Sequence, residues 1–158
     1  MEKTVEKLIQ ILRERAWHIT FAESCTGGGI ASTFTAVAGA SEVFEGGFVT
    51  YSEATKTAML GVDPDTIAQY TVYSEAVARE MAEGAAKAVG AEVAVSVTGI
   101  AGPSGALPGI PVGTVCFGYT IAGHTTTERV HFNLPDRTAI RSASIQHALA
   151  RVEELLQK

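Results

Sequence analysis

The sequence predicts an α/β fold, a three-layer α/β/α sandwich around a mixed, mostly parallel sheet of about five strands. Three observations favour it: helical patterns alternate with strand-like runs over residues 3–97, two strand-like runs separated by a short turn follow, and a helical pattern closes the chain. With 158 residues and 46% hydrophobic content, the chain is long enough to bury a core. We therefore expect a single domain over residues 1–158.

The expected helices are marked by apolar residues three or four positions apart and by suitable residues at their ends. In chain order they are 3–15, 30–37, 53–60, 66–69, 74–89 and a last helix that starts near Pro135. Ser52 and Ser74 are good N-caps, because a serine hydroxyl accepts a hydrogen bond from a free backbone N–H of the first turn. Glu53 suits the positive end of the helix dipole.

The expected strands are apolar or β-branched runs bounded by turn residues. They are 17–22, 45–51, 91–97, 112–121 and 125–132. The last two predict an antiparallel hairpin around Gly123. Ligands collect at the carboxyl ends of strands in open α/β sheets, so three segments should converge if the first three strands are parallel. These are the turn at Ser24, the strand end at Tyr51 and the loop 98–105.

Composition disfavours several classes of function. Lys and Arg total 12 against 17 Asp and Glu, a net charge of -5, and no basic run suggests a nucleic-acid surface. No run of about 18 apolar residues appears, and the amino terminus resembles an amphipathic helix rather than a signal peptide. We therefore expect a cytoplasmic protein that binds neither nucleic acid nor a membrane.

Cysteine and histidine positions suggest neither a metal site nor a disulfide framework. Cys25 and Cys116 form no Cys-x-x-Cys pair. The histidines are scattered without a ligand-like spacing, at His18, His124, His131 and His147. We expect no metal and no cofactor.

The segment 22–29, Ala-Glu-Ser-Cys-Thr-Gly-Gly-Gly, reads as a tight turn from a strand into a helix. Its glycines allow a sharp turn and close approach to a ligand, and the helix start would supply unpaired N–H groups for an anion. Ser24 and Cys25 are potential nucleophiles, although the serine also suits a helix N-cap and the cysteine a buried filler. The turn matches no P-loop, dinucleotide or Gly-x-Ser-x-Gly motif, so by itself it leaves both roles open.

Lys56 is the nearest candidate base, because no histidine lies close to this turn in the sequence. It could project inward from its helix, or it could be an ordinary solvated lysine. As a base near neutrality its pKa must fall by about three units from about 10.4, and a carboxylate close to it would oppose that shift. Glu23 is therefore diagnostic: paired with Lys56, it would keep the lysine charged. Tyr51 could relay a proton or orient the lysine, or simply end its strand.

Five stretches in order carry a joint pattern: 22–28 (AESCTGG), 47–52 (GFVTYS), Lys56 with 60–62 (LGV), 96–103 (SVTGIAGP) and 111–115 (PVGTV). Together they resemble the CinA carboxyl-terminal domain family, the nicotinamide-nucleotide amidases also called PncC or NMN deamidases. The resemblance spans nearly the whole chain. It implies metal-independent hydrolysis of the carboxamide of nicotinamide mononucleotide (NMN), giving nicotinic acid mononucleotide and ammonia, in pyridine nucleotide recycling.

Carried over residue by residue, the resemblance implies Ser24 as the nucleophile, Lys56 as the general base and Tyr51 as their helper. The implied substrate-binding positions lie in the turn, in the second loop and on the last helix. They are Thr26, Gly27, Gly28, Thr98, Gly99 and Gly102, with Arg137 or Arg141 for the phosphate. Backbone N–H groups of the glycine turn would hold the oxyanion.

The chain departs from the family pattern in the second loop. Many relatives have a Gly-Gly pair after Pro-x and a lysine just before Pro-Val-Gly-Thr, where this chain has Gly105-Ala106 and Ile110. The missing lysine removes one positive charge, so the affinity for a phosphate is the property most affected.

Two alternatives remain at this point. One is an amidase in which Cys25 is the nucleophile, and the other is a nucleotide-binding or regulatory module without turnover. We also expect a homo-oligomer, because apolar stripes on the two terminal helices would allow a face for self-association.

Overall fold

The computed structural model describes residues 1–158 and contains one sheet with the strand order β2-β1-β3-β4-β5. Its strands are β1 (Ile19–Glu23), β2 (Phe48–Val49), β3 (Val93–Gly99), β4 (Thr114–Ile121) and β5 (His124–His131). The predicted α/β fold with a mixed, five-stranded sheet is confirmed.

The prediction of a mostly parallel sheet is wrong. β1 runs parallel to β2 and β3, whereas β4 runs antiparallel to both β3 and β5. A parallel neighbour needs a crossover connection, usually through a helix. The segment 100–113 between β3 and β4 contains no helix, and only Ala122 and Gly123 separate β4 from β5, so both connections reverse the chain direction.

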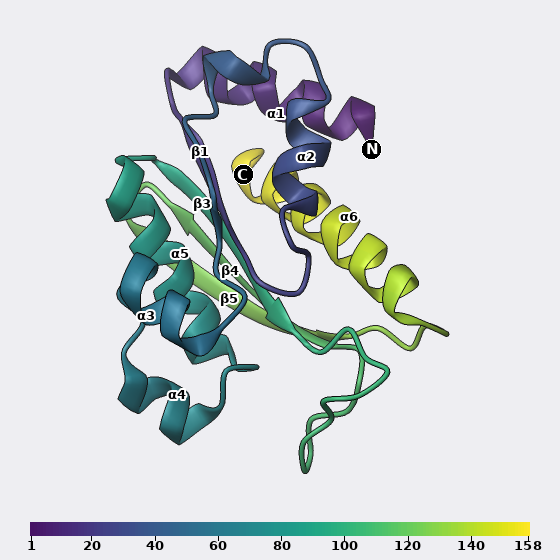
Figure 1. Cartoon of the computed structure of the whole chain (residues 1–158). Helices are drawn as coiled ribbons and strands as arrows, with labels where there is room; N and C mark the ends of the chain where they lie inside the picture. Colours follow the sequence, from purple (N-terminus) through teal and green to yellow (C-terminus); the bar gives the residue numbers. More distant parts are fainter.

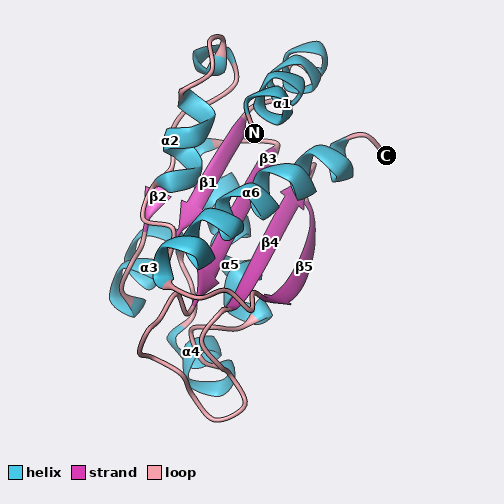
Figure 2. Cartoon of the chain, turned by 90° about the vertical axis from the view of Figure 1, so that its right-hand side faces the viewer, coloured by secondary structure: helices cyan, strands magenta, loops and turns pink.

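Each of the six predicted helices is present, with ends shifted by a few residues. They are α1 (Glu2–Arg15), α2 (Gly29–Thr35), α3 (Glu53–Leu60), α4 (Pro64–Tyr70), α5 (Glu75–Val89) and α6 (Arg137–Leu156), and an unpredicted 3-10 turn η1 covers Ala40–Glu42. Helices α1, α2 and α6 cover one face of the sheet, and α3, α4 and α5 cover the other (Figure 1). Figure 2 shows α6 lying across the face of the sheet.

The two faces of the sheet carry side chains of different size. Phe21 and Phe117 belong to the large core beneath α1, α2 and α6. The residues facing α5 are small, and this helix lies close to the sheet: the Ser96 hydroxyl donates a hydrogen bond to the Ala78 carbonyl oxygen. A side chain at Gly118 would meet the same oxygen. Close packing of α5 therefore depends on small residues in the strands.

The apolar stripes of the terminal helices α1 and α6 are buried in the core of the chain. Leu8 and Leu12 of α1 are fully buried, as are Leu149 and Val152 of α6, in one cluster with the sheet. These residues therefore offer no free face between chains, and the basis of the expected homo-oligomer is removed.

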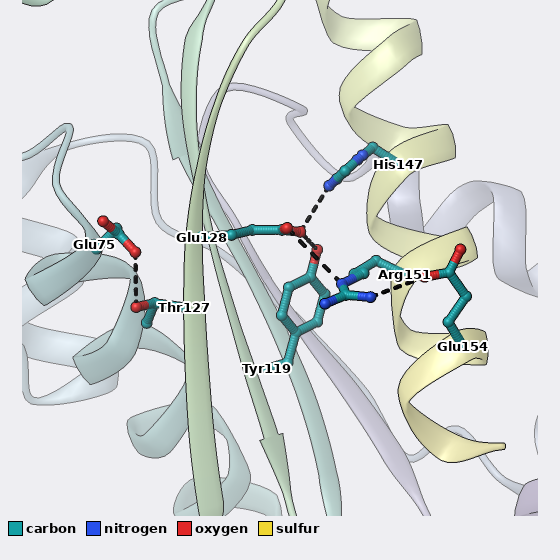
Figure 3. A network of polar contacts seen from close by, with 7 residues as sticks. All are labelled: Glu75, Tyr119, Thr127, Glu128, His147, Arg151 and Glu154. Atoms are coloured by element: carbon teal, nitrogen blue, oxygen red, sulfur yellow. Dashed lines mark hydrogen bonds and ion pairs between the residues drawn. The ribbon is translucent and has the colours of Figure 1, made fainter. Parts of the chain in front are cut away.

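A polar network joins α6 to the end of the sheet (Figure 3). Glu128 of β5 accepts a 2.8 Å hydrogen bond from the Tyr119 hydroxyl and lies 2.7 Å from Nε2 of His147. Arg151 approaches the other oxygen of Glu128 at 3.8 Å and pairs with Glu154. Burial and the hydrogen bond to Glu128 raise the pKa of Tyr119, so its phenol stays protonated and keeps donating.

None of the helices has the length and apolar character that a membrane crossing requires.

Gly84 of α5 packs directly on the end of α3. A Cβ atom at this position would overlap the carbonyl oxygen of Leu60, which is backbone and cannot move aside cheaply. We therefore expect Gly84→Ala to lower the free energy of unfolding by about 1–3 kcal/mol. In an unconstrained helix the same change would stabilise by about 1 kcal/mol.

Urea denaturation with Gly46→Ala as the control checks this prediction, because a Cβ at Gly46 would meet nothing within 4 Å. An unchanged or higher midpoint for Gly84→Ala would contradict the close contact of α3 with α5.

Candidate active site

The carboxyl ends of the three parallel strands meet at one edge of the sheet. Ser24 follows β1, Thr50 and Tyr51 follow β2, and Gly99 ends β3. A cavity of about 370 Å³ opens at this edge. Six of the catalytic and substrate-binding residues that the family resemblance implies line it: Ser24, Tyr51, Lys56, Gly99, Gly102 and Arg137.

Ser24 and Lys56 form a buried pair beside the cavity. Nζ of Lys56 lies 2.8 Å from Oγ of Ser24 and 2.6 Å from the carbonyl oxygen of Thr50. The two residues are 8% and 1% exposed, so bulk water competes little for these contacts. Ser52 caps α3 by accepting a 3.1 Å hydrogen bond from the N–H of Thr55, which fixes the helix that carries Lys56.

Burial sets the protonation chemistry of Lys56. Removal from water lowers the pKa of Lys56 from its ordinary 10.5 to about 8, because desolvation disfavours the charged ammonium. Cys25 and Glu53 raise it, but by less than burial lowers it. A substantial fraction of Lys56 is therefore neutral, and able to accept a proton, slightly above neutral pH.

Glu23 does not pair with Lys56. Its buried carboxylate accepts hydrogen bonds from the Thr26 hydroxyl (2.7 Å) and from the N–H groups of Ile30 (2.8 Å) and Ala31 (3.0 Å). The carboxylate thus compensates the positive end of α2, where backbone N–H groups lack helical partners. Glu53, one turn earlier on α3, is therefore the carboxylate that raises the pKa of Lys56, and it does so by less than burial lowers it.

The same arrangement corrects the expectation that the start of α2 offers free N–H groups to an anion. Glu23 occupies those of Ile30 and Ala31, and the N–H groups of Gly27 and Gly29 bond inside the turn. The donors in the turn that have no acceptor in the chain are the N–H groups of Cys25, Thr26 and Gly28.

Tyr51 contacts Arg137 rather than the Ser24 and Lys56 pair. Tyr51 is 60% exposed, and its hydroxyl accepts a 2.7 Å hydrogen bond from Nη2 of Arg137. Nη1 of Arg137 donates to the carbonyl oxygen of Gly102 at 2.9 Å. Arg137 is thus held over the cavity from two sides.

Five predicted substrate-binding residues do not line the cavity. Arg141 donates from Nε and Nη2 to the carbonyl oxygens of Cys25 (3.0 Å) and Thr26 (3.1 Å), and so braces the turn from its place on α6. The Thr98 hydroxyl is buried and donates to the carbonyl oxygen of Val72. The Thr26 hydroxyl is bonded to Glu23, while Gly27 and Gly28 have φ of 58° and 95°, a conformation in which glycine is favoured.

Cys25 lines the cavity but lacks the features of a reactive thiol. It is 5% exposed, and burial raises its pKa to about 12. The thiolate is the reactive form of cysteine, and it is essentially absent at neutral pH when the pKa is so high. Nζ of Lys56 makes its hydrogen-bonding contact with the Ser24 hydroxyl, so the geometry favours the serine over the cysteine as a nucleophile.

Sequence reasoning missed several residues around the cavity. Thr50 holds Lys56 through its backbone carbonyl, a contact that has no sequence signature. Tyr73 lines the cavity although its segment carries no motif. Glu53 also lines it, and its position one helical turn before Lys56 was a usable signal. Nowhere do three or more His, Cys, Asp or Glu side chains gather closely enough to hold a metal ion.

Comparison with known proteins places this geometry in a family. The model of the CinA C-terminal domain matches residues 1–156. The nicotinamide-nucleotide amidohydrolase PncC of Enterobacter agglomerans is 50% identical over 131 residues, spanning 82% of this chain and 79% of that protein. The protein of the same name from Escherichia coli (strain K12) is 48% identical over 145 residues, spanning 91% and 87%.

A solved structure agrees over nearly the whole chain. The competence damage-inducible protein A (ComA) from Klebsiella pneumoniae subsp. pneumoniae MGH 78578 has a TM-score of 0.95 and 35% sequence identity, covering 99% of this chain and 96% of that one. This chain therefore belongs to the CinA C-terminal domain family.

Proposed function

We propose that the protein hydrolyses the carboxamide of NMN to nicotinic acid mononucleotide and ammonia, with Ser24 as the nucleophile and Lys56 as the general base. The observation that carries the proposal is the 2.8 Å contact between Ser24 Oγ and a buried lysine beside a cavity. The substrate comes from the relatives, whose name is nicotinamide-nucleotide amidohydrolase. Such a reaction would serve the recycling of pyridine nucleotides.

In the first half of the reaction, neutral Lys56 accepts the hydroxyl proton of Ser24 while Oγ bonds to the carboxamide carbon. The carbonyl of Thr50, 2.6 Å from Nζ, accepts one N–H of the neutral amine and leaves the lone pair to face Ser24. The carbonyl oxygen becomes an oxyanion. The N–H groups of Cys25, Thr26 and Gly28, which have no acceptor in the chain, are the candidates to bind it.

The ammonium of Lys56 then returns its proton to the amide nitrogen, the C–N bond breaks and ammonia leaves, which completes the first half. In the second half, water donates a proton to neutral Lys56 and attacks the acyl carbon. The Ser24 ester bond breaks, Oγ regains a proton from Lys56, and nicotinic acid mononucleotide is released. One residue thus acts as base and then acid in each half, which a pKa of about 8 permits.

Arg137 is the candidate for the phosphate. Apart from Lys56 it is the one cationic residue that lines the cavity, and Tyr51 and Gly102 hold its guanidinium in place. Tyr51 in this arrangement orients Arg137, the residue proposed to bind the phosphate, and makes no hydrogen bond with Ser24 or Lys56.

Purified protein incubated with NMN should release ammonia and nicotinic acid mononucleotide in equal amounts. We expect Ser24→Ala to lower kcat by at least about a thousandfold, because it removes the atom that forms the ester. Cys25→Ala is the matched control next to it in the turn, and it should retain most of the activity. Loss of activity in Cys25→Ala together with an active Ser24→Ala would overturn the assignment of the nucleophile.

The pH dependence of kcat/KM should report the protonation of Lys56 in the free enzyme. Because the neutral amine is the active form, kcat/KM should rise with pH and level off above the pKa of Lys56, about 8. On the acidic limb we expect a slope of about tenfold per pH unit. A profile that stays flat through this region, or that falls as pH rises, would exclude Lys56 as the base.

A further inference from the structure

Glu53 is a carboxylate without a partner at the rim of the active-site cavity. It lies in the first turn of α3, it is exposed, and its side chain makes no hydrogen bond or ion pair in the chain. The mechanism above assigns it no part. A free carboxylate is unexpected in a cavity meant for an anionic nucleotide, since it repels the phosphate.

The placement of Glu53 relative to Lys56 offers a reason. The two residues are three positions apart on α3, so they lie on the same side of the helix one turn from each other. Ser24 Oγ must reach the carboxamide carbon beside Lys56. In NMN only the ring atoms C2 and C3 separate that carbon from N1, whose pyridinium carries a positive charge, so the cationic ring must lie close to this end of α3.

Two aromatic side chains contribute to the same cavity. Tyr51 and Tyr73 line it together with Glu53. The face of a phenol ring attracts a cation, and a carboxylate adds a full opposite charge. We propose that Glu53, together with these two tyrosines, forms a subsite that recognises the positive charge of the pyridinium ring, and so selects the oxidised nucleotide over its neutral dihydropyridine form. This inference rests on the proposed function.

The experiment compares NMN with its reduced form, dihydronicotinamide mononucleotide, which keeps the ribose, phosphate and carboxamide but has no ring charge. Dissociation constants for both are measured by calorimetry in a Ser24→Ala background, so that no turnover interferes. Glu53→Gln is added to this background. Because Glu53 also raises the pKa of Lys56, both ligands are measured at one pH and the ratio of their constants is compared.

Asp65→Asn is the matched control: Asp65 lies in the first turn of α4, its carboxylate makes no hydrogen bond in the chain, and it does not line the cavity. Glu53→Gln should weaken NMN binding about tenfold, the scale of one charge pair in a partly solvated site, and leave the reduced form bound equally or more tightly. Asp65→Asn should leave the ratio unchanged.

Equal weakening of both ligands would overturn the inference, because it would assign Glu53 to the ribose or to the fold. An unchanged ratio would overturn it as well. Failure of the proposed function has a separate signature. If the wild-type protein does not hydrolyse NMN and the Ser24→Ala variant does not bind it, both the proposed function and this inference are overturned.

Discussion

The site depends on one interaction, the hydrogen-bonding contact between Nζ of Lys56 and Oγ of Ser24, two residues that are largely buried from bulk water. Three parallel strands bring their carboxyl ends to the same edge, and α3 leaves that edge with Lys56 facing inward. Glu23, beside Ser24, could have paired with Lys56 and kept its pKa high. Its carboxylate caps α2 instead, so burial is the dominant influence on the lysine.

A buried lysine carries a cost in stability. Its pKa in the folded chain, about 8, is below the 10.5 of an exposed lysine, so the unfolded state binds more protons between these values. This residue alone makes the free energy of unfolding rise with pH across that window, and below it the buried charge is a constant penalty.

Arg141 holds the turn of Ser24 through hydrogen bonds to its carbonyl oxygens. The network around Glu128 fastens α6, which carries Arg141, to the sheet.

Much of this arrangement could be predicted from the sequence, because it depends on local patterns. Periodicity located the six helices, and the glycine turn with Ser24 marked the edge where three strands end. The direction of β4 was missed, although no helix was expected between residues 97 and 112 and a parallel neighbour needs a crossover connection, usually through a helix. The bracing role of Arg141 depends on contacts between segments far apart in the sequence. The partners of Glu23 and the carbonyl that holds Lys56 are near in sequence but are mostly backbone groups, whose positions periodicity does not encode.

The most direct test of the account is to trap the acyl-enzyme. Wild-type protein mixed with NMN is quenched in acid within the first turnover, digested and analysed by mass spectrometry. The account predicts a nicotinate mononucleotide ester on the peptide that contains Ser24, located by fragmentation to that residue and removed by hydroxylamine. An adduct on Cys25, or product formed in the first turnover with no adduct on any residue, would contradict it.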